Sequence, residues 1–99
     1  MITKALIVRL QARSGQEETV DGFLRDALAL VEDEPDTVAW FALRTGASSF
    51  AIVDVFPDEA GRRAHLDGPV AAALEKHGTE LLAEPPVIEQ VDVIVSKLP

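Results

Sequence analysis

Three side chains of this sequence combine a titratable group with surroundings that could tune it: Asp54, His65 and His77. Asp54 is the single charged residue of the apolar stretch FAIVDVF, residues 50–56. Burial there disfavours the charged form of a carboxyl group and raises its pKa unless a partner compensates. Histidine exchanges protons near neutral pH, so both imidazoles are candidate acids or bases. These residue types indicate general acid–base chemistry.

Each of the three also has a purely structural explanation. Asp54 could pair with Arg44 or Arg9 at the end of a strand, instead of serving as a tuned acid in a pocket. His65 is a lone histidine in a short helix and could face solvent. His77 falls at helical spacing between two leucines, which turns it towards the apolar face as a histidine at the edge of the core.

The immediate surroundings of His65 suggest a position at a border with water. Ala60 and Ala64 are small residues one helical turn apart, so we expect them to lie against a sheet. Arg62 and Arg63 are then expected to face solvent. His65 is expected at the mouth of a cavity, with a pKa near the ordinary value for histidine.

The sequence contains no motif for several other kinds of site. The chain has no cysteine, which excludes disulfides, thiolate metal sites and cysteine nucleophiles. The two histidines and Asp54 lack the close spacing of a recognised metal motif, so no metal is expected. The six glycines are scattered, so there is no phosphate loop and no fingerprint for flavin or nicotinamide. No serine lies in a nucleophile elbow.

The elements that must position these residues follow from apolar periodicity and turn signals. Ser14 and Glu17 have the spacing of a capping box, and Asp58 is expected to cap a second helical region that pauses at residues 67–69. The order β-α-β-β-α-β predicts an α+β fold of the ferredoxin-like split βαβ type with an antiparallel sheet. The predicted strands are residues 2–12, 37–45, 49–56 and 87–97, and the predicted helical regions are about 14–33 and 57–83.

Both faces of the predicted sheet are apolar. In the second strand Trp40 and Ala42 lie on one face, and Phe41 and Leu43 on the other. Helices of the same chain can cover one face, whereas the other needs a partner. We therefore expect a homodimer that packs sheet to sheet.

Length and charge narrow the function classes further. The 99 residues, 47% of them hydrophobic, suffice for one domain over residues 1–99. A net charge of -8 argues against nucleic acid and against anionic membranes. The start of the chain does not read as a signal peptide, and no apolar run reaches membrane-spanning length. A soluble, cytoplasmic protein is expected.

The segment Asp54-Val55-Phe56-Pro57-Asp58-Glu59-Ala60, running on to His65, resembles the antibiotic biosynthesis monooxygenase family. The usual pattern after the third strand is an acidic residue, an aromatic residue two positions later, an acidic helix start and a histidine near the helix end. The resemblance covers about residues 2–97. It implies a dimeric α/β barrel with one ligand cavity per subunit, between the sheet and its own helices.

The resemblance also implies an activity. Characterised members oxidise quinols or phenolic intermediates with dioxygen and need neither metal nor flavin, so the implied cofactor is none and the implied partners are a small aromatic molecule and dioxygen. Two alternatives remain: a non-catalytic dimeric barrel that binds a small hydrophobic metabolite, and a haem-degrading monooxygenase, whose asparagine this chain lacks. The implied site has His65 or Asp54 as base or anion stabiliser, with Trp40, Phe41, Phe56 and His77 as substrate-binding residues.

Overall fold

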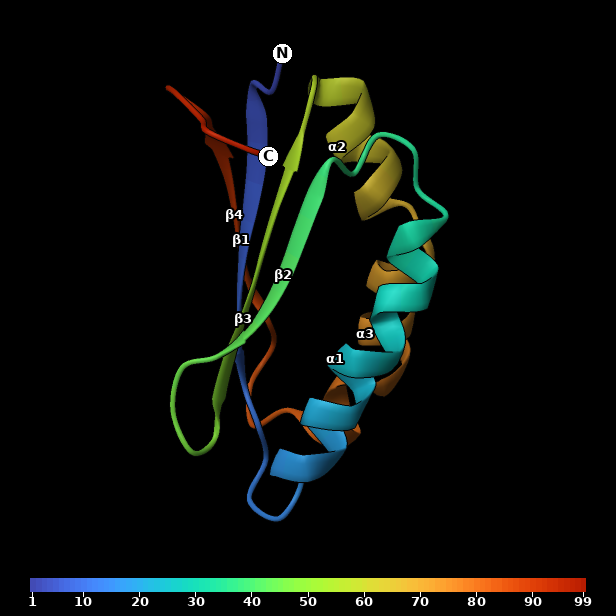
Figure 1. Cartoon of the computed structure of the whole chain (residues 1–99). Helices are drawn as coiled ribbons and strands as arrows, with labels where there is room; N and C mark the ends of the chain where they lie inside the picture. Colours follow the sequence, from blue (N-terminus) through green and yellow to red (C-terminus); the bar gives the residue numbers. More distant parts are fainter.

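The four strands form one antiparallel sheet in the order β2-β3-β1-β4, and all helices lie on one of its faces (Figure 1). This is the ferredoxin-like arrangement predicted from the sequence. The computed structural model describes residues 1–99. Its elements are β1 (Lys4–Gln11), α1 (Glu17–Glu32), β2 (Ala39–Arg44), β3 (Ser49–Phe56), α2 (Glu59–Leu66), α3 (Pro69–Leu81) and β4 (Val87–Asp92).

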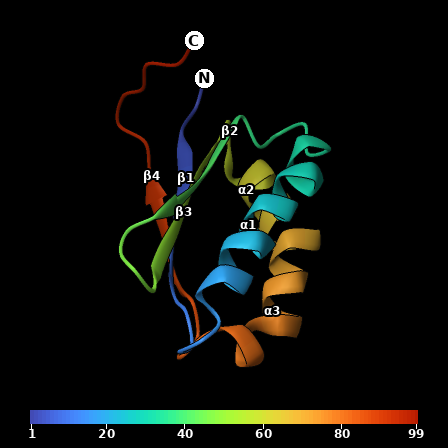
Figure 2. The ribbon, with the colours of Figure 1, turned by 60° about the horizontal axis from the view of Figure 1, so that its bottom comes forward.

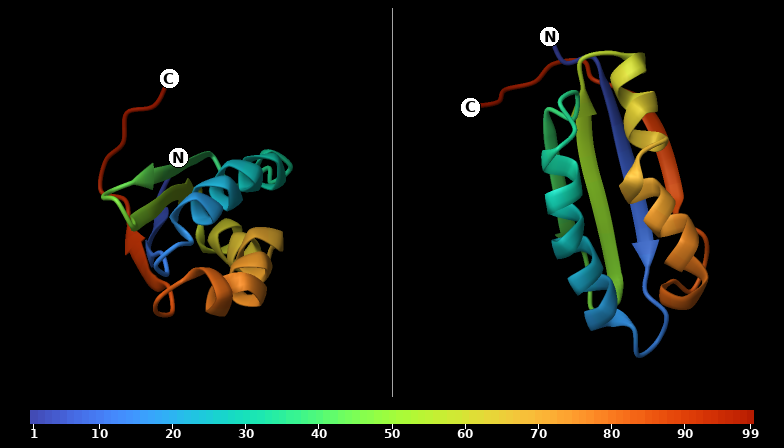
Figure 3. Two further views of the ribbon diagram at one scale, coloured as in Figure 1. Left: turned by 90° about the horizontal axis from the view of Figure 1, so that it is seen from below. Right: turned by 90° about the vertical axis from the view of Figure 1, so that its right-hand side faces the viewer.

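The second helical region divides where the sequence predicted a pause. Asp67 ends α2, Gly68 caps α3, and Pro69 occupies the first turn of α3, where its missing N–H costs nothing. Figure 3 (right) shows α2 and α3 following one another along one side of the sheet, with α1 beside them. None of the helices is long and apolar enough to cross a membrane.

The last strand is shorter than predicted. β4 ends at Asp92, and the remaining residues leave the sheet as an extended tail (Figure 2). Ile94 and Val95 on this tail are almost fully exposed. Their β-branched side chains suit a strand, but the last backbone hydrogen bond to the neighbouring chain segment runs from the Val93 amide to the Thr3 carbonyl, at 2.9 Å.

The core lies between the sheet and the helices. Alternate residues of β1 and β3 point towards the helices and are buried against α1. The largest cluster comprises Val8, Leu10, Ala12, Val20, Leu24, Phe50, Ile52 and Leu82.

The opposite side, which we call the bare sheet face, has no helix over it (Figure 2). Phe41 is 53% exposed there, and Leu43 and Val87 are exposed as well. Strand alternation places Ile7 and Val53 on the same face. The second apolar face predicted from the sequence is therefore present and uncovered.

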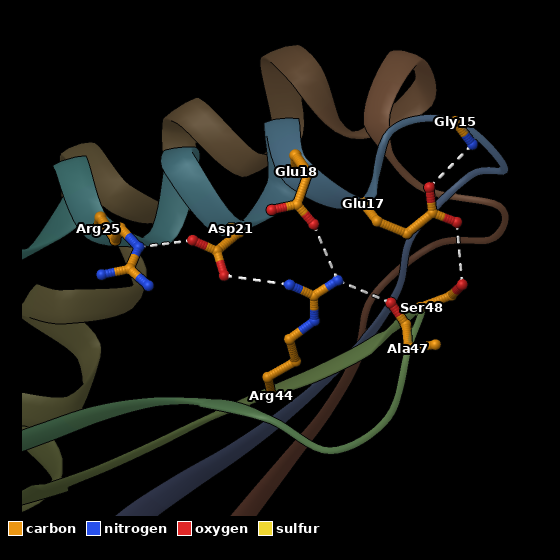
Figure 4. Close-up of polar contacts among 8 residues, drawn as sticks. All are labelled: Gly15, Glu17, Glu18, Asp21, Arg25, Arg44, Ala47 and Ser48. Atoms are coloured by element: carbon orange, nitrogen blue, oxygen red, sulfur yellow. Dashed lines mark hydrogen bonds and ion pairs between the residues drawn. The ribbon is translucent and has the colours of Figure 1, made fainter.

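The start of α1 differs from the predicted capping box. Gln16 is the N-cap residue, and no side chain caps it. The chain turns at Gly15, whose φ of 86° favours glycine, and α1 begins after this turn. Glu17 instead accepts hydrogen bonds from the Gly15 amide and from the Ser48 hydroxyl, both at 2.9 Å (Figure 4).

Candidate functional site

The helix α2 turns a different face to the sheet than expected. Its buried residues are Gly61, Arg62 and His65, whereas Ala60 and Ala64 are exposed. Asp58 caps the helix as predicted, accepting a hydrogen bond from the Gly61 amide at 2.9 Å.

Gly61 explains this choice of face. A Cβ at this position would lie 3.0 Å from the Cβ of Asp36 in the connection between α1 and β2. The absence of a side chain therefore lets α2 lie against that connection. Rotation of this face towards the protein brings His65 inside.

The ring of His65 lies between two carboxylates. Nδ1 is 2.6 Å from Oε1 of Glu34, and Nε2 is 2.9 Å from Oδ2 of Asp54. The side chain of His65 is 8% exposed and that of Asp54 is fully buried. Phe56 lies behind the ring, with its centroid 5.4 Å away. His65 is thus buried, and the expectation that it borders water is wrong.

The two carboxylates favour the protonated ring. Burial lowers the pKa of His65, but the nearby carboxylates of Asp54 and Glu34 outweigh burial, and the net pKa is raised above 6.5. The protonated cluster carries one positive and two negative charges. Because the carboxylates lie at opposite nitrogens of the ring, the three groups do not converge on one point, as ligands of a metal ion must.

Asp54 is paired with His65, and neither of its suggested arginine partners is near. Neither carboxylate oxygen accepts a hydrogen bond of ordinary geometry, although Nε2 of His65 is close. Arg44 instead donates hydrogen bonds to the carboxylates of Glu18 and Asp21 on α1 and to the carbonyl of Ala47 in the hairpin between β2 and β3 (Figure 4).

Arg9 pairs with Glu89 on β4. It lies on the strand face that alternates away from the helices, so it cannot reach Asp54 on the helix side.

Glu34 was not anticipated as a site residue. Glu34 lies just beyond the end of α1, in the segment Glu34-Pro35-Asp36, whose sequence pattern indicates only a helix stop. Its Oε1 also accepts a hydrogen bond from the Thr37 hydroxyl at 2.7 Å, and its Oε2 is buried without a partner. No local pattern in the sequence links position 34 to position 65.

Arg62 is buried, contrary to the expectation that it faces solvent. Its Nη1 donates to the carbonyls of Ala5 and Val91 at 3.2 and 3.0 Å, and its Nη2 to the carboxylate of Glu59. The guanidinium thus anchors α2 to the pair β1 and β4. Arg63 is exposed, as expected.

A cavity of about 560 Å³ lies between α3 and the strands β1 and β4, and His65 lies at one end of it. Its size is typical of small-molecule sites. The walls along its length are apolar, formed by residues such as Leu6, Val8, Val70, Leu74 and Ile88.

The four other predicted binding residues do not line this cavity. Phe56 is fully buried behind His65, and Phe41 is on the bare sheet face. Trp40 lies opposite Asp54 in the β2–β3 register and packs into the core, with its indole N–H buried and unpartnered. His77 lies on another side of α3, beside Phe23 and Leu81. The structure brings Asp54 and His65 together and places Trp40 beside Asp54 in the sheet but outside the cavity, whereas Phe41 and His77 lie apart from them.

The whole chain is similar to a protein of known structure. The chain is similar over its whole length to a crystal structure of a protein of unknown function from Nitrosomonas europaea, with 50% identity, a TM-score of 0.98 and 96% of that chain covered. The chain belongs to the same family as that protein. No protein-family model matches the chain, and no curated protein does either.

More distant structures share the fold. A structure named antibiotic biosynthesis monooxygenase matches 93% of this chain and 99% of its own, with 14% identity and a TM-score of 0.78. A protein from Mycobacterium tuberculosis matches 95% of this chain and 97% of its own, with 13% identity and a TM-score of 0.83. The resemblance to antibiotic biosynthesis monooxygenases is therefore confirmed at the level of the fold.

Proposed function

We propose that this protein is a monooxygenase without a cofactor that oxidises a small phenol or quinol with dioxygen. The observation that carries the proposal is the position of His65, a titratable group with two carboxylate partners at the end of an apolar cavity. Such an arrangement suits proton removal from a substrate that is held against apolar walls. The fold shared with antibiotic biosynthesis monooxygenases supports the choice of reaction.

The proposed reaction begins when neutral His65 takes the proton of a substrate hydroxyl. Glu34 and Asp54 then stabilise the imidazolium that forms. The electron-rich substrate anion reduces dioxygen: one oxygen atom enters the substrate, and the other leaves as water together with two substrate hydrogens. The substrate supplies all the electrons, so the reaction balances without another reductant.

One contact of His65 must open for this step, because both ring nitrogens face carboxylates. The contact with Asp54 is the weaker candidate, since it lacks ordinary hydrogen-bond geometry, whereas Nδ1 is well placed on Glu34. In the proposed complex Nε2 turns from Asp54 to the substrate hydroxyl, and Glu34 holds the other side of the ring.

Oxygen uptake with a panel of hydroquinones and naphthols tests the proposal. His65→Gln is expected to reduce turnover by about 10²–10⁴-fold, the usual contribution of a general base. His77→Gln is the matched control, because that histidine lies outside the cavity, and it is expected to leave turnover unchanged. Equal activity of the two variants would refute the role of His65.

A second candidate function is binding without catalysis. It is favoured by the engagement of both His65 nitrogens within the protein and by the absence of tyrosine and asparagine from the chain. A protein that binds phenols but takes up no oxygen with any of them would support this candidate.

We further propose that a second copy covers the bare sheet face. An apolar surface of this kind on a small domain is typical of an interface. Val53→Lys, in the middle of that face, is expected to convert a dimer into a monomer in light scattering. A wild-type monomer at micromolar concentration would contradict the proposal.

A further inference from the structure

The long dimension of the cavity follows α3. Val70, Leu74, Gly78 and Leu82 recur every four residues and all line it, so the cavity accompanies the helix over three turns. At 1.5 Å per residue this is about 18 Å. A volume of about 560 Å³ over that length leaves a mean cross-section of about 30 Å². Such a channel has room for one alkyl chain or one aromatic ring seen edge-on.

The polarity along the channel is uneven. The polar residues Arg13, Glu75, Thr79 and Glu84 also line it, and because all four are exposed they lie on its solvent-facing side. His65 is the one buried polar side chain that lines it. The walls away from that side are apolar, and a hydroxyl or charge of a ligand that faces them would find no partner.

Charge at the inner end restricts the polar group of the ligand. The two groups that contact His65, Glu34 and Asp54, are both carboxyl groups. An anionic head group such as a carboxylate would lie against them and is therefore disfavoured. A neutral hydroxyl can donate a hydrogen bond to the cluster of His65, Glu34 and Asp54.

We propose that the ligand of this cavity is an elongated phenol or quinol with an unbranched apolar tail. Its ring lies at His65, and its tail lies beneath α3 towards Gly78. The phenolic head rests on the proposed function, whereas the tail rests on the shape and polarity of the channel. The length accommodates one ring and a tail of about eight carbons.

Calorimetric titration of the wild-type protein with 4-alkylphenols tests the tail. From 4-methylphenol to 4-octylphenol the affinity is expected to rise about fourfold for each added methylene, the gain from burying that group. Longer tails are expected to add nothing, because they extend past the channel. Alkanoic acids of matched length are expected to bind at least about tenfold more weakly at pH 8, because of the buried carboxylates.

A variant that fills the outer half of the channel tests its location. A Cβ at Gly78 meets only Leu82, at 4.0 Å, so a larger side chain is accommodated. Gly78→Leu is expected to lower the affinity for 4-octylphenol by at least about tenfold, which corresponds to the loss of a few buried methylenes. The affinity for 4-methylphenol is expected to stay within about twofold of the wild-type value. Gly22→Leu in α1 is the control, because Gly22 has open space around it and does not line the channel. Circular dichroism verifies that both variants fold.

The outcomes separate this inference from the proposed function. An affinity that is independent of tail length would refute the proposed apolar tail, and so would a Gly78→Leu variant that binds 4-octylphenol like Gly22→Leu. Alkanoic acids that bind as well as phenols would refute the proposed phenolic head group. A rise with tail length but no oxygen uptake keeps the elongated ligand and refutes the monooxygenase. Oxygen uptake with an affinity that does not depend on tail length would support the monooxygenase and refute the elongated ligand.

Discussion

Replacing Glu34 by glutamine changes the charge beside His65 and keeps a group that can accept its Nδ1–H. In the wild-type protein the pKa of His65 is raised, so the stability from the charged ring is complete below about pH 6.5 and is lost as the pH rises through the folded-state pKa. Glu34→Gln removes one of the two negative charges responsible. A hydrogen bond to a charged group contributes about 1.5–3 kcal/mol, of which the neutral amide keeps part.

We therefore expect Glu34→Gln to lower the free energy of unfolding by about 1–2 kcal/mol at pH 6. Raising the pH to 9 favours the neutral ring, which loses the charge that Glu34 stabilises, so the variant is expected to match or exceed the wild type there. Urea unfolding followed by the fluorescence of Trp40, the single tryptophan, measures this at both pH values.

Glu32→Gln is the control for that experiment, since Glu32 is an exposed glutamate at the end of α1, two positions before Glu34. It is expected to change the stability by less than about 0.5 kcal/mol at either pH. An equal loss for Glu34→Gln at pH 6 and pH 9 would refute the reasoning, because the effect would then not depend on the charge of His65.

Three other results are expected. Gly61→Ala should cost about 1–3 kcal/mol in thermal unfolding because its Cβ meets Asp36 at 3.0 Å, whereas Gly22→Ala, with open space, should stabilise α1 by up to about 1 kcal/mol. Arg62→Met should lower the free energy of unfolding by about 2–4 kcal/mol and leave the Glu59 carboxylate without its ion-pair partner. Arg63→Met, on the exposed side of α2, should have little effect on stability. With any substrate that shows oxygen uptake, kcat/KM should rise with pH, with a midpoint above pH 6.5, because the raised pKa of the buried imidazole means that its neutral form appears only at higher pH. A midpoint at or below pH 6.5 would contradict His65 as the base.

The fold could be predicted from the sequence because its signals are local. Apolar periodicity, the hairpin at residues 46–48 and the cap at Asp58 each depend on neighbours along the chain, and each is present. The extent of the last strand depends on its partner, and β1 ends the pairing before Ile94. A pattern of β-branched residues cannot report where the neighbouring strand stops.

The site was predicted only in part for the same reason. Asp54 stood out because it is charged within an apolar strand, but its partner depends on which face α2 buries. Two alanines suggested one face, whereas the close approach at Gly61 selects the other. Glu34 and His65 are 31 positions apart, and only the packed structure brings them together.

The pairing of β1 with β4 makes the two ends of the chain neighbours. Lys4 contacts Asp92 at 2.7 Å, and the termini emerge at the same end of the sheet as α2 (Figure 1). The chain is therefore suited to circular permutation, with the old termini joined by a short linker and new ones opened in the exposed hairpin at residues 46–48. A domain fused to either end of this chain would extend from this end of the sheet, whereas the outer end of the channel, near Arg13 and Pro85, lies at the opposite end and would stay accessible.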